Sequence, residues 1–86
     1  MANSPVSSAH QIRNALETQN MTQADLAKRS GLSAQYISDI LRERRRISAE
    51  AADRFERVLG LDAIGLLVAQ AETDLYWARR TMSDGN

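Results

Sequence analysis

The chain has no cysteine, a single proline and four glycines among its 86 residues. The lack of cysteine excludes disulfides and thiolate metal sites, and it is compatible with a reducing compartment. So few prolines and glycines leave long stretches free to form helices. The first residues lack the basic and apolar regions of a secretion signal, and no apolar run approaches the roughly 20 residues of a membrane span. We therefore expect a soluble, cytoplasmic protein.

Groups for catalysis are also scarce. The chain has one histidine, and its sequence shows no paired carboxylates, no histidine cluster and no set of a nucleophile with a base. We therefore expect neither an enzyme nor a metal or cofactor site.

The chain has no net charge, because 11 basic residues balance 11 acidic ones. DNA-binding domains are usually basic, so this balance at first argues against a nucleic-acid partner. The basic residues are unevenly placed, however, and the segment Arg42–Arg46 holds four arginines and one glutamate. A local basic patch on a neutral protein gives phosphate affinity with limited non-specific binding.

Apolar residues recur at helical spacing and nothing alternates with a period of two, which predicts one all-α domain of five helices over residues 8–82. The expected helices are 8–19, 22–29, 33–42, 48–59 and about 62–82, with flexible ends at 1–7 and 83–86. Expected start signals are Ser8 with Gln11, Thr22 with Asp25, Ser33 and Ser48, and expected stop signals are Gly31 and Gly60. The last helix carries an apolar stripe made of Ile64, Leu67, Val68, Ala71, Leu75 and Ala78.

The second and third predicted helices meet the requirements of a helix-turn-helix motif. Two short helices are joined by a tight turn that contains Gly31. Ala27 is small enough for the helices to approach closely, and the apolar residues that must point inward are at the expected spacing. Those residues are Leu26, Leu32, Ile37 and Ile40.

The segment MTQADLAKRSGLSAQYISDILRERRRIS resembles the Cro/CI-type, or XRE, helix-turn-helix family. The continuation ISAEAADRFERVLG and the later QAETDLYWAR are similar to the HigA-like antitoxin branch, so that the resemblance covers residues 21–79. It implies a lambda-repressor-like DNA-binding domain. The family usually has Asn-Gly after the third helix, whereas this chain has Arg42–Glu43, which would allow that helix to extend by a turn.

In such a fold the third helix lies in the major groove. Gln35 is the best candidate reader, because an amide pairs with adenine, and Ala34 can contact a thymine methyl group. The alternatives are that Gln35 and Ser38 are ordinary solvated surface, that Tyr36 is partly core, and that Asp39 is a structural partner of Arg42 or Arg44. The expected base-reading residues are Ala34, Gln35, Tyr36, Ser38, Asp39 and Arg42.

Phosphate contacts are expected at the start of the second helix, where backbone N–H groups and the helix dipole attract anions, and in the arginine segment. The alternatives are that the arginines form an ordinary exposed loop or that they pair with nearby Asp and Glu residues. The expected phosphate-binding residues are Thr22, Gln23, Ser33, Arg44, Arg45 and Arg46.

The last helix is longer than a DNA-binding core needs. Leu75, Tyr76 and Trp77 suit a protein–protein interface, although Trp77 could instead fold back on the domain's own core. We expect a homodimer whose recognition helices, about 34–36 Å apart, match a palindromic operator in double-stranded DNA.

These features predict a sequence-specific transcriptional regulator, a dimeric repressor. One alternative is an antitoxin that neutralises a partner ribonuclease toxin and regulates its own operon. Another is an interaction module that does not bind DNA.

Overall fold

The computed structural model describes residues 6–84, and within that range the chain forms five helices and no strand. The helices are α1 (Ser8–Thr18), α2 (Gln23–Ser30), α3 (Ala34–Leu41), α4 (Ala49–Leu59) and α5 (Ala63–Asp84). The predicted all-α class and order of elements are confirmed. α5 continues two residues beyond its predicted end at Met82. Of the predicted flexible ends, residues 1–5 and 85–86 lie outside the described part of the chain.

Each of the first four helices begins where a serine or threonine hydroxyl accepts a hydrogen bond from a backbone N–H that has no partner inside the helix. Thr22, Ser33 and Ser48 cap α2, α3 and α4 as predicted. The predicted cap of α1 is wrong by one residue, because Ser7 and not Ser8 accepts the N–H of His10, at 3.1 Å. At the start of α5, the Asp62 carboxylate accepts the N–H of Gly65.

The core joins the apolar faces of all five helices. Its largest fully buried side chains are Phe55, Ile12, Leu26, Ile37 and Leu66. Burying an aliphatic or aromatic side chain of this size contributes roughly 1.5–3 kcal/mol. Within residues 6–84, no buried side-chain nitrogen or oxygen lacks a hydrogen-bond partner. The core is therefore largely apolar, and the buried Ser8 and Ser30 are the polar exceptions among the described residues.

The α5 helix has a buried inner face and an exposed outer face, and most of its apolar stripe lies on the outer one. Leu66 and Ala69 face the core and are 0% and 5% exposed. Ile64 and Leu75, from the predicted stripe, are instead 72% and 51% exposed. Leu67, also from the apolar stripe, packs against the core. The other members of the stripe are exposed and, together with Met82, form a row on the outer side of α5 that we call the outer stripe.

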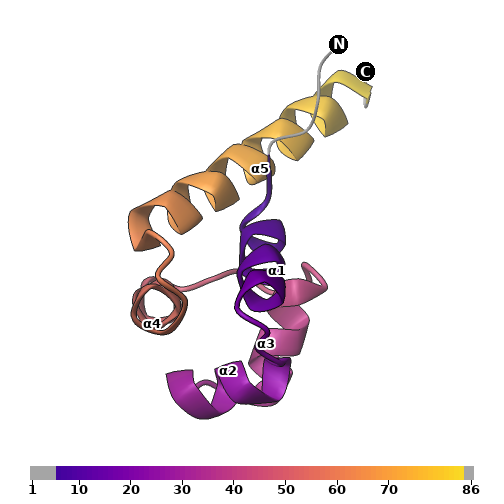
Figure 1. Cartoon of the computed structure of the whole chain (residues 1–86). Helices are drawn as coiled ribbons and strands as arrows, with labels where there is room; N and C mark the ends of the chain where they lie inside the picture. The colour runs from indigo at the N-terminus through magenta and orange to yellow at the C-terminus, as the bar shows by residue number, and fades with distance from the viewer. Residues whose placement is uncertain (1–5, 85–86) are drawn as a thin grey trace.

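The helices place two surfaces at opposite ends of the molecule (Figure 1). α2 and α3 lie together at one end, while α5 crosses the other end above α1 and α4. The molecule is elongated, with principal extents of 46 × 24 × 19 Å. A partner bound by the outer side of α5 therefore does not cover α2 or α3.

Candidate nucleic-acid interface

The turn between α2 and α3 depends on Gly31. This residue has φ +76°, a left-handed conformation that side chains other than glycine adopt at a cost of about 1 kcal/mol or more. Its N–H donates to the Ala27 carbonyl and ends α2. A Cβ atom here would also lie 2.8 Å from the Arg54 guanidinium, which itself donates to the Ser30 carbonyl. The predicted stop signal is confirmed, and Arg54 is an additional cap from α4.

The α3 helix divides into a buried and an exposed face. Ile37 and Ile40 are 0% and 2% exposed and fix the helix to the core. Ala34 and Gln35 are exposed on the first turn, with Ser38 and Asp39 half-buried beside them. The structure therefore presents a short polar face of the size that a major groove accepts.

A hydrogen bond links two of the predicted base-reading residues. Gln35 donates from Nε2 to Oδ1 of Asp39 at 2.9 Å, across one turn of α3. Among the described side chains, those of residues 6–82, the ion pairs are Arg46–Asp74, Arg54–Glu50 and Arg57–Asp53, so the expected alternative of Asp39 pairing with Arg42 or Arg44 is not observed.

Tyr36 holds the segment that follows α3. Its hydroxyl accepts the N–H of Ser48 at 3.2 Å and donates to the carbonyl of Arg46 at 3.3 Å. The Arg45 guanidinium lies over its ring, 5.3 Å from the centroid, in a cation–π contact. The half-buried Tyr36 thus helps to position the arginines that follow α3.

We call the exposed segment Arg42–Arg46 the basic loop. This segment does not continue α3 as a helix. The sequence had allowed such an extension, because Arg42–Glu43 stands where the family usually has Asn-Gly. Glu43 instead adopts φ +59°, with its N–H on the Ile40 carbonyl and the N–H of Arg44 on the Asp39 carbonyl. This is the Schellman pattern that usually places glycine or asparagine at the left-handed position.

Replacing Glu43 by Gly is expected to stabilise the domain by about 0.5–1 kcal/mol. Glycine adopts the left-handed conformation without strain, which stabilises the folded state. Part of this gain is lost, because glycine also has more conformational freedom in the unfolded chain. Thermal unfolding followed by circular dichroism should show a rise of roughly 3–5 °C. Glu43→Ala is the matched control, because it removes the carboxylate but keeps the Cβ atom. An equal rise in both variants would show that the charge, and not the backbone, matters.

The basic loop is also fastened to α5. The side-chain amide of Gln70 accepts the N–H of Ile47 at 2.6 Å and donates to its carbonyl at 3.0 Å. Arg46 forms an ion pair with Asp74 on the next turn of α5. Sequence reasoning missed both α5 residues, since contacts across more than 20 residues leave no local signal.

Arg13 of α1 was missed for the same reason. Its guanidinium donates to the carbonyl of Leu41 at 2.5 Å, at the end of α3. This contact satisfies a carbonyl that the helix itself leaves without a donor.

The start of α2 offers fewer phosphate donors than predicted. Thr22 and Asp25 form a capping box, in which the Thr22 N–H donates to the carboxylate and the Asp25 N–H donates to the hydroxyl, each at 3.0 Å. The backbone and hydroxyl of Thr22 lower the pKa of Asp25 below its usual 3.8, so the carboxylate stays ionised at neutral pH. The Thr22 N–H is thus engaged, and the N–H groups of Gln23 and Ala24 remain for an anion.

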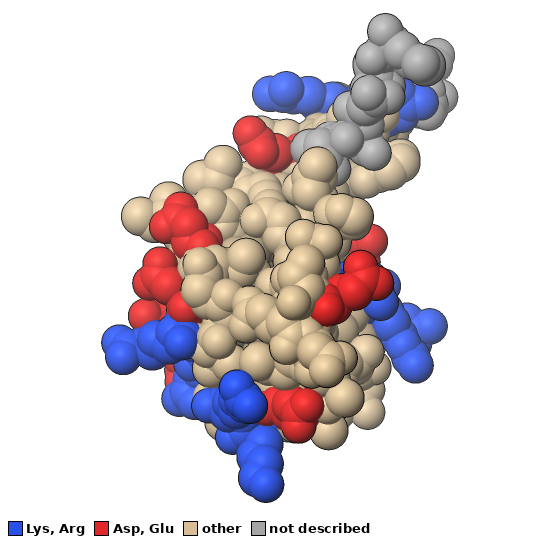
Figure 2. Space-filling view, in the orientation of Figure 1, with Lys and Arg blue, Asp and Glu red and all other residues tan. Residues whose placement is uncertain are grey.

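Charged side chains are concentrated away from the middle of the molecule (Figure 2). In this view Lys and Arg project chiefly from the half that holds α2, α3 and α4, with acidic side chains among them, and from the far end of α5. Within residues 6–84 no group of three or more potential ligands could hold a metal ion. In the same range, no helix is both long and apolar enough to cross a membrane.

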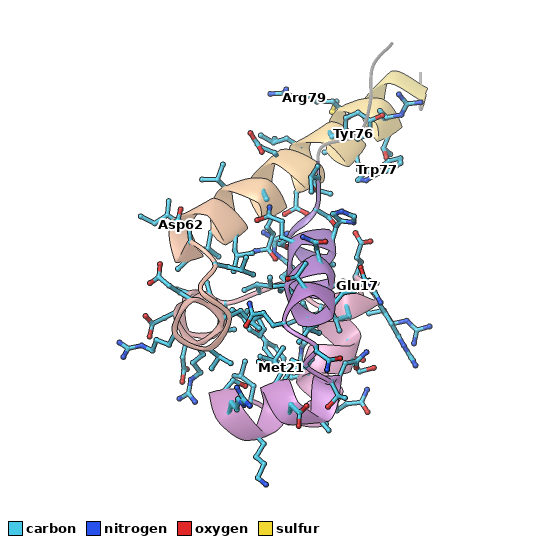
Figure 3. The ribbon with its side chains drawn as sticks, in the orientation of Figure 1. Glu17, Met21, Asp62, Tyr76, Trp77 and Arg79 are labelled. Carbon is cyan, nitrogen blue, oxygen red and sulfur yellow. The ribbon has the colours of Figure 1, made fainter. Side chains whose placement is uncertain are left out.

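The three predicted interface residues of α5 lie on two faces. Leu75 belongs to the outer stripe, whereas Tyr76 and Trp77 pack edge to face, with ring centroids 5.1 Å apart. Trp77 points to the opposite side of α5 from Arg79 (Figure 3). Trp77 is 55% exposed, so the alternative in which it folds back on the core is wrong.

Comparisons with known proteins identify the same helix-turn-helix motif. A helix-turn-helix family model matches residues 12–66. The structure is similar to the antitoxin GraA, with 26% identity and a TM-score of 0.87 over 98% of this chain and 91% of that one. It is also similar to PA4674 of Pseudomonas aeruginosa in complex with its operator DNA, with 29% identity and a TM-score of 0.84 over 94% and 90%.

A third similar structure is the P. aeruginosa antitoxin HigA with the higBA promoter. It shares 30% identity at a TM-score of 0.77, over 94% of this chain and 87% of that one. No curated protein sequence matches the chain.

Proposed function

The chain belongs to the helix-turn-helix family, and from this membership we propose that it is a sequence-specific transcriptional regulator that binds double-stranded DNA as a dimeric repressor. The observation that carries the proposal is the exposed polar face of α3, which ends in a basic loop held in place by Tyr36. A binding role, with no catalysis, and a cytoplasmic location follow from this assignment.

In this proposal α3 enters the major groove. Gln35 and its neighbours face base edges, while the basic loop and the N-terminus of α2 contact phosphates on either side. The residues assigned to bases are Ala34, Gln35, Ser38, Asp39 and Arg42, with the ring edge of Tyr36. Those assigned to phosphates are Thr22, Gln23, Ser33, Arg44, Arg45 and Arg46.

The outer stripe of α5 supports a homodimer. Its members recur with alternating spacings of four and three residues, as in the seam of a coiled coil. Exposed apolar side chains in one row are typical of an interface. These residues are Ile64, Val68, Ala71, Leu75, Ala78 and Met82. Because α5 and α3 lie at different ends of the molecule, pairing through the outer stripe leaves α3 of each copy uncovered (Figure 1).

A second candidate function is that of an antitoxin. Its support is the similarity to GraA and to HigA, both antitoxins, over most of each chain. The test is whether the neighbouring reading frame encodes a small toxin whose expression arrests growth and whether this chain relieves the arrest. Relief by a variant with Gln35 and Arg45 both replaced by Ala would separate neutralisation from DNA binding.

DNA binding is tested by fluorescence anisotropy with the duplex upstream of the protein's own reading frame. We expect Arg45→Ala to weaken binding to all sequences and to reduce the salt dependence by about one counterion. Gln35→Ala should instead relax specificity at one base pair, by about 1–3 kcal/mol.

The matched control is Arg57→Ala, since Arg57 is an exposed arginine on α4 that pairs with Asp53, outside the proposed DNA contacts. Absence of binding at low salt, or binding that neither Gln35→Ala nor Arg45→Ala alters, would refute the proposed function.

A further inference from the structure

We propose that Asp39 is a specificity-determining residue: it fixes the orientation of the Gln35 amide so that α3 selects adenine and rejects guanine at one base pair. The inference rests on the proposed DNA-binding function and extends it, because it assigns to Asp39 a role that acts through Gln35.

The orientation of the amide follows from the donors and acceptors involved. A carboxylate only accepts hydrogen bonds, so the Gln35 amide must turn its nitrogen, and not its oxygen, towards Asp39. The observed bond from Nε2 to Oδ1 at 2.9 Å has this arrangement. Asp39 is half-buried whereas Gln35 is exposed, so the carboxylate is the more restrained partner. A long side chain that would otherwise rotate freely is thereby held before DNA arrives, which lowers the entropic cost of binding.

The groups that remain on the amide match adenine. One N–H of Gln35 is used by Asp39, which leaves one N–H donor and the carbonyl oxygen. Adenine presents one acceptor, N7, and one donor, the N6 amino group, in the major groove. Guanine presents two acceptors, N7 and O6, and would need two donors from the same side chain. The linked pair thus accepts adenine and leaves an acceptor of guanine unpaired.

The charge of Asp39 also favours adenine over guanine. The carboxylate takes part in none of the ion pairs among the described side chains, so no described arginine neutralises it directly. An acidic group in the groove repels phosphates and the electronegative edge of guanine, and it lowers affinity for every sequence. Such a repulsive element is a common source of specificity. Removing the Asp39 carboxylate should therefore raise the affinity for every DNA sequence and lower the preference for adenine over guanine.

The experiment begins with selection of duplexes from a random pool by the wild-type protein. The pair read by Gln35 is identified as the one whose preference is lost in Gln35→Ala. Four duplexes that differ only at this pair are then titrated by anisotropy. For the wild type we expect adenine to be bound about tenfold more tightly than guanine.

For Asp39→Ala we expect tighter binding to all four duplexes and a preference for adenine of less than about threefold. Asp39→Asn should also lose most of the preference, because asparagine can accept from or donate to the amide in either orientation. In a Gln35→Ala background, Asp39→Ala should leave the preference at this pair unchanged.

Asp53→Ala and Asp53→Asn are the matched controls, since Asp53 likewise accepts a hydrogen bond across one helical turn, from Arg57, but lies on α4. Thermal melts verify that each variant is folded. If Asp39→Ala tightens binding yet keeps the tenfold preference, Asp39 acts only as a charge and the inference is overturned. If the wild type binds no duplex, the proposed function fails instead, so the two failures are distinguishable.

Discussion

Replacing Leu75 by Asp is expected to convert the protein from a dimer to a monomer and to weaken operator binding by about 100-fold or more. In the proposed pairing, Leu75 of each copy lies in the apolar seam, and a carboxylate buried there without a partner costs several kcal/mol. A monomer contacts one half-site, and it loses the gain of 10²–10⁴ that linking two binding sites provides. Size-exclusion chromatography with light scattering measures the mass, and anisotropy measures the affinity.

Trp77→Ala is the comparison that identifies the face used for pairing. Trp77 lies on a different side of α5 from Leu75, so we expect this variant to keep the mass of a dimer. If Trp77→Ala is monomeric and Leu75→Asp is still a dimer, the interface is the aromatic face and the assignment of the outer stripe is wrong. If both variants and the wild type have the mass of one chain, the homodimer itself is excluded.

The second large effect is expected from Leu66→Ala, which should reduce the free energy of unfolding by about 2–5 kcal/mol. Leu66 is completely buried and packs α5 against the core. Loss of its side chain removes apolar contacts and leaves a cavity, and small domains have only about 5–15 kcal/mol of total stability. Urea denaturation followed by circular dichroism gives the difference.

Ile64→Ala is the control for this measurement. It deletes a side chain of equal size from the same helix, but Ile64 is 72% exposed, and we expect a change within about 0.5 kcal/mol. Both variants are best compared in a Leu75→Asp background, where pairing contributes nothing to stability. An equal loss of unfolding free energy in Leu66→Ala and Ile64→Ala would contradict the assignment of Leu66 to the inner face of α5 and of Ile64 to its outer face.

The features that could be predicted from the sequence are those determined within a few residues. Thr22, Ser33 and Ser48 are helix caps because a hydroxyl reaches an N–H three residues ahead, and Gly31 and Gly60 end helices because they tolerate a positive φ. These local signals predict the two short helices and the turn of the helix-turn-helix motif. The cap of α1 was misplaced because two adjacent serines, Ser7 and Ser8, offer the same chemistry.

The remaining features depend on contacts between distant parts of the chain. In α5, Ile64, Leu66, Leu67 and Val68 surround the helix with apolar side chains, so periodicity alone does not reveal which side packs inward. The roles of Arg13, Gln70 and Asp74 arise only when the fold brings them to α3 and the basic loop. The hydrogen bond between Gln35 and Asp39 was also not predicted, although their four-residue spacing places them on neighbouring turns of one helix face.

The bridge between Gln70 and Ile47 has a consequence for the length of the operator. It bonds the end of the basic loop to the helix that we assign to dimer contacts. In the proposed dimer we therefore expect the two copies of α3 and the paired α5 helices to behave as one rigid frame. One extra base pair between half-sites rotates one of them by about 35° around the duplex, since a turn contains 10–10.5 base pairs. A rigid frame cannot follow that rotation without breaking contacts. The protein would then recognise the spacing between the half-sites as well as their base sequences.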